Sequence, residues 1–247
     1  THPKTKGLKY LAYAGGIALN IVTSHGIISA GLIDPDKLFI PPMPSDTGLA
    51  IGAAAMVSEK IYGLNPMARM RHAYYGTSYS DDQIRATLDS FGLTEGQDYI
   101  RLDSEEDIAR LTAEYVAEGK VVAWFQGEGE LGQRALMHRS LILNLSDLNA
   151  NDKANRIKGR QPWRPSAITL TEQEAQGVFS DIHYAPFMVM SCAVPPSKQD
   201  VIVAGIHADK TTRPQTVTEE ANPLAWSMLN YLKSLTGIAG VVNTSFN

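Results

Sequence analysis

Apolar residues recur at helical spacing in some stretches of the chain and form short continuous runs in others. The spacing predicts helices at 17–30, 47–62, 81–90, 104–119 and 223–235, with Ser45 and Asp46 as candidate N-caps of the second. The short runs predict strands at 11–14, 38–40, 99–102, 120–126, 139–144, 166–170, 187–194, 201–208 and 241–247, of which 11–14 and 120–126 should be buried. Strands that alternate with helices indicate an α/β or mixed α+β fold.

Residues 63–79 are rich in Gly, Asn, Pro and Tyr and show little periodicity, so we place a domain boundary near residue 70. This gives two expected units, 1–70 and 71–247. The chain has no initiator Met and no signal-peptide pattern, and its last residues read as a strand running into a turn. We therefore expect a piece of a longer protein whose second domain is cut short, and which is inactive alone.

The composition is that of an ordinary folded protein, with 247 residues, 44% hydrophobic and 19% charged. No apolar run approaches the roughly 20 residues that span a bilayer, which argues against a membrane protein. Cys192 is the single cysteine, so no intrachain disulfide can form, and a cytoplasmic location is expected. We expect Cys192 to be a buried small apolar residue, and His25, His72, His138 and His183 to be structural.

The formal net charge of −4 conceals a strong asymmetry. Residues 131–164 carry seven basic side chains against Asp147 and Asp152, whereas the rest of the chain has 15 basic and 24 acidic residues. Such a run is often only a solvated basic face. Here Gly159, Pro162 and Pro165 disfavour a regular helix, so the cations should sit on a shaped loop. The planar guanidinium of arginine can donate two hydrogen bonds to the oxygens of one phosphate, so the pattern is compatible with a small phosphorylated ligand.

The segment 127–132 matches G-x-G-x-x-G literally, after a predicted strand. Two glutamates within it would repel a pyrophosphate, and little room is left for a following helix before the strand at 139–144. The segment is better interpreted as a glycine-shaped turn that presents Arg134 and Arg139.

Seven segments, taken in order, carry a resemblance to a known family. They are AGGIALN (14–20), PSDTGLAIGAA (44–54), WFQGEGELGQRALMHRS (124–140), NRIKGRQPWRP (155–165), APFM (185–188), HADKTTRPQTV (207–217) and NTSFN (243–247). As an ordered set they resemble the O-carbamoyltransferases of the NodU/CmcH type, the family that includes tobramycin carbamoyltransferase. The chain departs from the family pattern at Glu128 (Arg), Gln133 (Pro), Met137-His138 (Gly-Asn) and Lys210 (Gly).

The resemblance implies that residues 1–70 end an ASKHA-type (actin-like ATPase) domain and that 71–247 form a YrdC-like domain with a twisted mixed sheet. In such enzymes the second domain makes carbamoyl-adenylate from carbamoyl phosphate and ATP, and the first transfers the carbamoyl group to a hydroxyl of a small acceptor. Its partners would be these small molecules, with no membrane and no nucleic acid, and a homodimer is left open. Further metal ligands and catalytic groups would lie upstream of Thr1.

The resemblance also implies site residues. The expected catalytic residues are Lys158, Arg164 and Arg213, and the expected substrate-binding residues are Arg134, Arg139, Lys158, Arg160, Arg164, Met188, His207, Arg213, Asn243 and Ser245. Cationic groups would bind phosphates, Asn243 and Ser245 would orient the carbamoyl amide, and Met188 would form an apolar wall. Gly15, Gly16 and Asn20 would bind the nucleotide, and Asp46 a divalent metal, Mg²⁺ or iron.

Two other functions remain open at this point. One is a related YrdC-family enzyme, either a threonylcarbamoyl-AMP synthase or a HypF-like hydrogenase-maturation protein. The other is an RNA-binding module that uses the basic window, for which a steep salt dependence and a gain with oligonucleotide length are expected.

Overall fold

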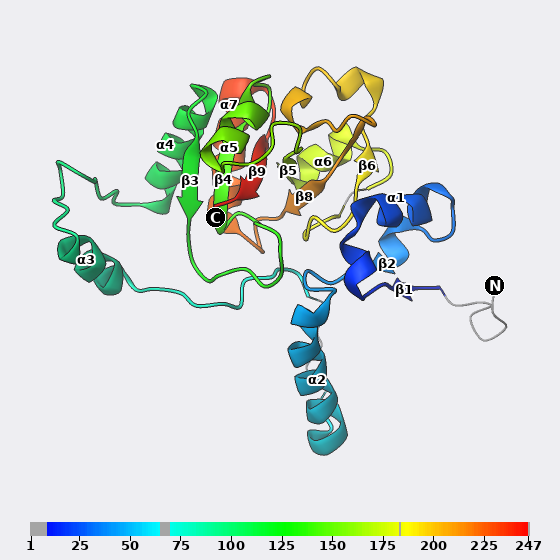
Figure 1. Ribbon diagram of the computed structural model, residues 1–247. Helices are drawn as coiled ribbons and strands as arrows, with labels where there is room; N and C mark the ends of the chain where they lie inside the picture. The colour runs from blue at the N-terminus through cyan, green and yellow to red at the C-terminus, as the bar shows by residue number, and fades with distance from the viewer. Residues whose placement is uncertain (1–8, 65–69, 183, 247) are drawn as a thin grey trace.

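Within the residues that the structure describes (9–64, 70–182 and 184–246 of a computed structural model), five strands form one mixed sheet at the centre of the molecule (Figure 1). In sheet order they are β3 (Val122–Phe125), β4 (Arg139–Asn144), β9 (Gly240–Ser245), β5 (Ala167–Thr171) and β8 (Pro214–Val217). All neighbouring pairs are antiparallel except β5 and β8, which run parallel. The expectation of a mixed α/β fold is confirmed.

Two layers of apolar side chains cover the two faces of the sheet. On one face, α4 (Glu105–Ala117) and α7 (Pro223–Thr236) pack together, and their cluster contains Ile142 and Val241. On the other face, α5 (Ala150–Ile157) and α6 (Glu172–Val178) belong to a second cluster that contains Leu143 and Val242. Because successive strand residues point to opposite faces, Val241 and Val242 belong to different layers.

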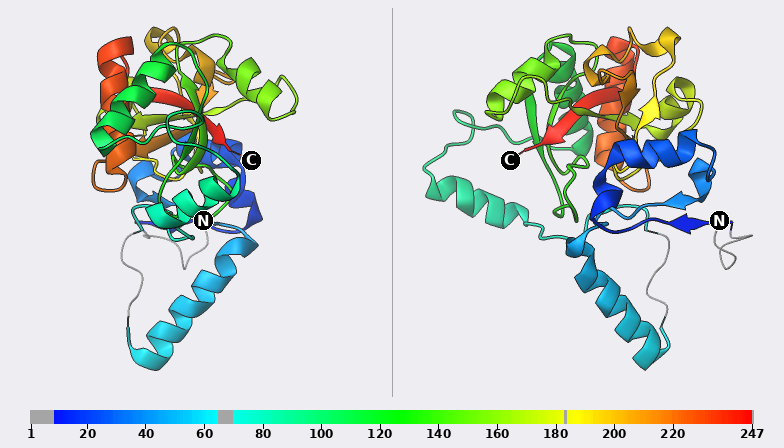
Figure 2. Two further views of the ribbon diagram at one scale, coloured as in Figure 1. Left: turned by 90° about the vertical axis from the view of Figure 1, so that its left-hand side faces the viewer. Right: turned by 45° about the vertical axis from the view of Figure 1, so that its right-hand side comes forward.

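The N-terminal part packs against the second of these layers. Strand β1 (Leu11–Ala12) pairs in parallel with β2 (Leu38–Phe39), and α1 (Ile21–Ser29) lies between them in the chain. Ala18, Ile28 and Leu38 join the same buried cluster as the sheet residues. In contrast, α2 (Leu49–Tyr62) has no buried residue, and both it and α3 (Asp81–Ser90) stand away from the sheet (Figures 1 and 2).

The predicted helices are confirmed, with small shifts at their ends. The first is interrupted at Asn20, where a 3-10 turn (Gly16–Leu19) gives way to α1. The predicted caps of α2 are wrong, because its N-cap is Gly48 and neither Ser45 nor Asp46 caps the helix through its side chain. Two helices, α5 and α6, were missed.

Several predicted strands need correction. The run 11–14 is a two-residue strand with exposed residues, and β3 is an edge strand in which only Trp124 is buried. Residues 99–102 contribute a single bridge, from Tyr99 to Glu95. The run 187–194 is buried except at Ala193, but in the described chain it pairs only at β6 (Cys192–Ala193), with β7 (Thr211–Thr212). The run 201–208 forms a 3-10 turn and bends. Apolar runs of this kind are buried as coil, since burial alone does not require a partner strand.

Cys192 is buried, as expected. His183 and Asn247, both included in sequence predictions, lie outside the described residues. So does part of the expected boundary segment, next to residue 70, and the division into 1–70 and 71–247 stays a prediction. None of the helices in the described ranges is long and apolar enough to cross a membrane.

Candidate functional site

Most of the predicted site residues meet at one end of the sheet. Strands β3 and β9 end there, while β4, β5 and β8 begin there. The reason is that β4 runs antiparallel to both β3 and β9, β5 runs antiparallel to β9, and β8 runs parallel to β5. Asn243 pairs with both Ile142 and Ala167 in the centre of this end, and Ser245 pairs with Ser140. In Figure 1 this end of the sheet lies toward the N-terminal part of the chain. The topology therefore gathers the predicted residues from four distant segments.

Arg213 is the most deeply embedded cation of the group. It lies between β7 and β8, and its carbonyl accepts a hydrogen bond from Ile168 in the neighbouring strand β5 at 3.1 Å. Its Nε is buried, and no described residue accepts a hydrogen bond from it. Burial, together with the positive charges of Arg134 and Arg160, lowers the pKa of Arg213 to about 9. A guanidinium beside two others, with no carboxylate paired to it in the described part of the chain, is a group that a nearby anion would stabilise.

Arg134 reaches the cluster from the loop between β3 and β4. One of its Nη atoms donates to the carbonyl of Leu19 at 3.1 Å, while its Nε is buried and without a partner among the described residues. Burial lowers the pKa of Arg134. The loop rests on the N-terminal part: Gln133 donates to Ser45 Oγ at 2.9 Å, and Gly132, at φ +96°, lies so close to the Pro42 carbonyl that a Cβ would be 2.1 Å from it.

A single carboxylate organises the second half of this loop. Oε1 of Glu130 accepts hydrogen bonds from three backbone amides, those of Leu136 (2.9 Å), His138 (2.9 Å) and Arg139 (3.0 Å). Met137, which lies between Leu136 and His138, adopts φ +72°, a backbone conformation that residues other than glycine seldom take. Such a backbone persists where its surroundings over-determine it, and Glu130 supplies that constraint.

Three more cations come from the segment that follows α5. The Lys158 ammonium donates to both the carbonyl and the Oγ of Ser245, and burial and the charges of Arg160 and Arg164 lower its pKa. Burial and the charge of Arg164 also lower the pKa of Arg160, whereas Arg164 itself is exposed. In the ion pairs formed by the described residues, no carboxylate is paired with Arg134, Arg160, Arg164 or Arg213.

A buried polar network lies on the sheet next to these cations. Asn243 is fully buried and donates from Nδ2 to Thr169 Oγ1 at 2.9 Å and to the Ala135 carbonyl at 3.2 Å. Thr169 in turn donates to Gln215 at 2.8 Å. Asn243 Oδ1 is buried without a partner among the described residues, so one acceptor remains available for an N–H group.

His207 and Met188 are placed differently. His207 lies at the start of a turn held by Asp209 and Thr211, and burial and the charge of Arg213 lower its pKa. The imidazole is therefore neutral near pH 7. Met188 is almost fully buried in the apolar cluster, at φ +53°. Contact between Met188 and a substrate stays a prediction.

Arg139 acts mainly within the protein. Its guanidinium donates to the carbonyls of Gln126, Gly127, His138 and Thr77 and lies 3.6 Å from the centroid of the Phe125 ring. It nevertheless borders a cavity of about 410 Å³ that is also lined by Arg134, Gln133, Glu130, Ser245 and Phe246. Binding of substrate by Arg139 stays a prediction, with most of its donors already engaged.

The predicted nucleotide residues form a second group. Gly15 adopts φ +101° and donates to the Pro44 carbonyl at 2.6 Å, which places the 15–20 turn next to the segment of Asp46. Asn20 Oδ1 accepts from the amides of Val22 (3.0 Å) and Thr23 (3.3 Å), so Asn20 is the N-cap of α1. Asp46 is exposed, and the described residues offer no group of three or more His, Cys, Asp or Glu side chains close enough to hold a metal ion.

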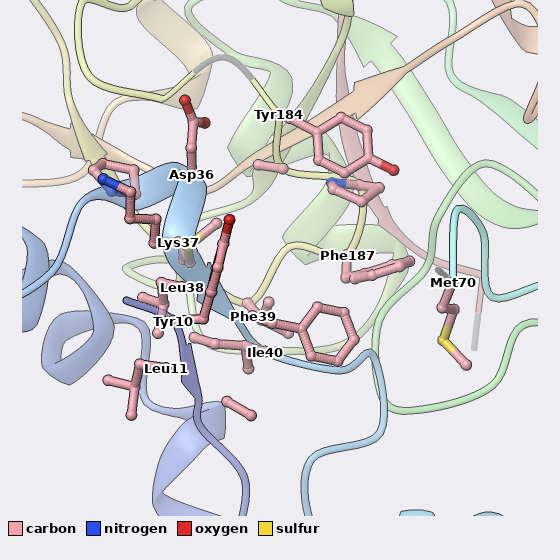
Figure 3. Close-up of a pocket in the computed structure, with 16 residues that line it drawn as sticks. Tyr10, Leu11, Asp36, Lys37, Leu38, Phe39, Ile40, Met70, Tyr184 and Phe187 are labelled. Atoms are coloured by element: carbon pink, nitrogen blue, oxygen red, sulfur yellow. The ribbon is translucent and has the colours of Figure 1, made fainter. Parts of the chain in front are cut away.

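A wide cavity lies away from the cations. A cavity of about 650 Å³ separates β1 and β2 from the segment 184–190, and Figure 3 shows Phe39, Ile40 and Phe187 around it. Its lining is mostly apolar, and of the predicted site residues within the described ranges none contributes to it.

Two residues whose side chains make three hydrogen bonds each beside the cations were not assigned a role from the sequence. Glu130 and Asn155 both fall within the motif segments, which was the available signal, but a motif does not distinguish a side chain that contacts a ligand from one that holds a loop.

Comparison with known proteins gives consistent matches along the chain. A family model described as Carbamoyltransferase N-terminus matches residues 1–55, and one described as Carbamoyltransferase C-terminus matches residues 113–247. Nodulation protein NolO of Bradyrhizobium diazoefficiens is 33% identical over 250 residues, covering 100% of this chain and 44% of that protein. Nodulation protein U of Rhizobium fredii is 31% identical over 246 residues, covering 100% and 39%. The chain thus spans less than half the length of these relatives.

Among solved structures, Sua5 of P. abyssi complexed with L-threonine is similar over 59% of this chain and 39% of that chain, with 18% identity and a TM-score of 0.38. A similarity of this size carries no argument about fold or activity.

Proposed function

The chain belongs to the carbamoyltransferase family and is part of a transferase, and from this we propose that its sheet end binds carbamoyl phosphate for an ATP-dependent O-carbamoyltransferase. The observation that carries the proposal is the partly buried Arg213, whose buried Nε has no hydrogen-bond partner among the described residues, whose guanidinium has no carboxylate partner there, and which has the like charges of Arg134 and Arg160 beside it. A small dianion would relieve this repulsion.

The proposed reaction has two stages. In the first stage, water forms a bond to the phosphorus of carbamoyl phosphate, the bond from phosphorus to the carbamoyl oxygen breaks, and phosphate leaves with the protons of the water. A carbamate oxygen then forms a bond to the α-phosphorus of ATP as the bond to pyrophosphate breaks, which gives carbamoyl-adenylate. The hydroxyl oxygen of a small acceptor then forms a bond to the carbamoyl carbon. The bond to AMP breaks, and the hydroxyl proton is released.

The residues of this chain would divide the first stage between binding and charge neutralisation. Arg134, Arg160, Arg164 and Arg213 would bind phosphate oxygens, with Lys158 and Arg164 also neutralising charge as pyrophosphate leaves. The unpartnered Oδ1 of Asn243 would accept from the carbamoyl amide and so orient it. Ser245 would hold Lys158 in place, because its Oγ accepts a hydrogen bond from the Lys158 ammonium.

The N-terminal part would serve the nucleotide and the acceptor step. The turn at Gly15 and Gly16 would approach the phosphates, and Asp46 would give one carboxylate oxygen to a divalent metal held also by those phosphates, as is usual for Mg²⁺. The remaining ligands would have to come from outside the described residues, so we derive no step that depends on the metal. An ASKHA-type first domain, a YrdC-like second domain and a cytoplasmic location belong to the same proposal.

Calorimetry with carbamoyl phosphate tests this function. The wild-type chain should bind it, and the double variant Arg164→Ala with Arg213→Ala should lose at least about tenfold in affinity, since bonds to charged groups contribute about 1.5–3 kcal/mol each. Arg85→Ala on α3, which stands away from the sheet end (Figure 1), removes one positive charge outside the site and is the control. Equal binding by the double variant and the wild type would exclude the site.

The same titration with oligonucleotides separates the RNA-binding alternative. A site for a small anion predicts no gain in affinity with oligonucleotide length, whereas an RNA-binding module predicts a gain together with a steep salt dependence.

A further inference from the structure

Among the described residues, the hydrogen-bond partners of the Asn155 side chain all lie in the segment that carries Arg160 and Arg164. Its Oδ1 accepts from Arg160 Nε, and its Nδ2 donates to the carbonyls of Pro162 (2.9 Å) and Arg164 (3.0 Å). The Asn155 carbonyl also accepts from the Arg160 amide at 3.0 Å. Asn155 is 2% exposed, so water does not reach its amide group, and protein groups must satisfy its hydrogen bonds.

The segment needs such a support, because residues 158–165 form turns and coil, and no helix or strand of their own. After α5 ends at Ile157, Gly159 adopts φ +58° and the chain doubles back over the end of the helix. Residues 161–165 are all exposed, including Trp163 at 78%. Both amide hydrogens of Asn155 and its amide oxygen are bonded to this segment.

The result is a fixed direction for the Arg160 guanidinium. Its Nε is held by Asn155, and one Nη donates to Ser166 Oγ at 3.2 Å. The other Nη has no protein partner within the described ranges. Ser166 directly precedes Ala167, which pairs with Asn243, and Lys158 at the start of the segment donates to Ser245. The segment therefore lies at the same sheet end as the cation cluster, and the charge of Arg160 acts on both Arg213 and Lys158.

We propose that Asn155 is a positioning residue of the anion site, which holds residues 160–164 so that Arg160 and Arg164 meet the phosphate of the substrate. The inference rests on the proposed function, since it assigns the cluster to a phosphorylated ligand. Asn155 touches no reacting atom; its effect passes through the two arginines.

The experiment follows inorganic phosphate binding by the rise in melting temperature, in the whole chain at constant ionic strength. Asn155→Ala should raise the dissociation constant by about 10- to 100-fold, the loss typical of misplacing groups that must meet in one geometry. Thr171→Ala removes a side-chain bond at the other end of β5, where Thr171 caps α6, and is the control for lost stability. It should leave phosphate affinity unchanged.

A second background separates positioning from general damage. In the double variant Arg160→Ala with Arg164→Ala, adding Asn155→Ala should change phosphate affinity by less than about twofold, because the groups it positions are gone. A further loss equal to that in the wild type would overturn the inference. If Asn155→Ala does not fold, Asn155→Asp keeps the shape and the bond from Arg160 but cannot donate to the two carbonyls, and wild-type affinity in that variant would also overturn it.

Arg213→Ala in the same assay tells the two proposals apart. If the wild type does not bind phosphate, or Arg213→Ala binds it equally well, the proposed function fails. If Arg213→Ala loses binding while Asn155→Ala keeps it, only the positioning role fails.

Discussion

Arg134 donates from Nη2 to the main-chain carbonyl of Leu19 at 3.1 Å, across 115 residues of sequence. Leu19 ends the 3-10 turn that contains Gly16, and the next residue, Asn20, caps α1. A residue of the proposed anion site is therefore held by the turn that precedes α1. A substitution in this turn should therefore affect both helix α1 and the position of Arg134.

Asn20 allows its two assignments to be separated. Asn20→Ala should lower the free energy of unfolding by about 1 kcal/mol through loss of the helix cap, whereas Asn20→Asp should cost only a few tenths because aspartate caps equally well. If Asn20 also binds the nucleotide, the aspartate variant will be stable yet will bind ATP more weakly, since its carboxylate repels phosphate. Urea unfolding and ATP titration on the same samples measure both effects. Unchanged ATP binding in Asn20→Asp would leave Asn20 as a cap alone.

Glu130 should matter more than its partly exposed position suggests. Glu130→Ala removes an oxygen that accepts from three backbone amides, and a loss of about 2–4 kcal/mol is expected because bonds to charged groups are the stronger ones. Glu130→Gln keeps an acceptor and should lose about half as much. Urea unfolding compares them, with Glu118→Ala at the end of α4 as an exposed control. If the alanine and glutamine variants prove equally stable, the three bonds do not contribute as described.

Two of the departures from the family pattern fall at positive φ. Met137 (φ +72°) and Lys210 (φ +64°) stand where the pattern has glycine, the residue that adopts this conformation most readily. Lys210→Gly should therefore stabilise the protein by about 1 kcal/mol, because Lys210 is exposed and leaves no cavity. Met137→Gly should destabilise it, because Met137 is fully buried and a cavity costs about 2–5 kcal/mol. Thermal unfolding decides, and the same sign in both variants would contradict this account.

The sequence predicted the helices well and the sheet only in part. Strongly periodic stretches such as 223–235 and 81–90 matched closely, the latter through a capping box between Ser80 and Gln83. Strand β8 was missed, since Pro214 opens it, and proline is tolerated there because β8 is an edge strand. Helix α5 was missed because only Ala150, Ala154 and Asn155 are buried on it, which leaves almost no apolar pattern.

The candidate site was predictable as a set of residue types and not as a geometry. The basic window pointed to Lys158, Arg160 and Arg164, and the motif 207–217 to Arg213. That these meet depends on β8 lying beside β5, a pairing across more than 40 residues that no local pattern encodes. The carbonyl contacts of Arg139, such as that with Thr77, are likewise set by neighbours that only the fold brings together. The capping role of Asn20 is different, because its partners are the amides of Val22 and Thr23, and a local sequence pattern could have predicted it.

His138 should make stability depend on pH. Burial is the main cause that lowers its pKa in the folded state below the ordinary value of 6.5, while its ring stacks on Tyr74 and its Nδ1 contacts the Glu128 carbonyl. The unfolded chain therefore binds more protons just below pH 6.5, and stability should fall as the pH drops from 6.5 toward the folded pKa. His138→Asn does not titrate and should flatten this part of the profile. Urea unfolding at pH 5, 6, 7 and 8 tests it, and an equally steep profile in the variant would assign the effect to other groups.

Because the pKa of Arg213 is lowered to about 9, binding of an anion at the proposed site should weaken at high pH. A bound anion stabilises the charged guanidinium, so binding takes place with Arg213 protonated and should be constant between pH 7 and 8. Above about pH 9, where the free site loses this proton, affinity should fall by up to about tenfold per pH unit. Sulfate is the suitable probe, because its own charge does not change in this range. Arg164→Ala is the matched comparison: Arg164 is exposed, so removing it should weaken binding at every pH without moving the limit. Sulfate affinity that stays level to pH 10.5 in the wild type would show that Arg213 keeps its proton or lies outside the site.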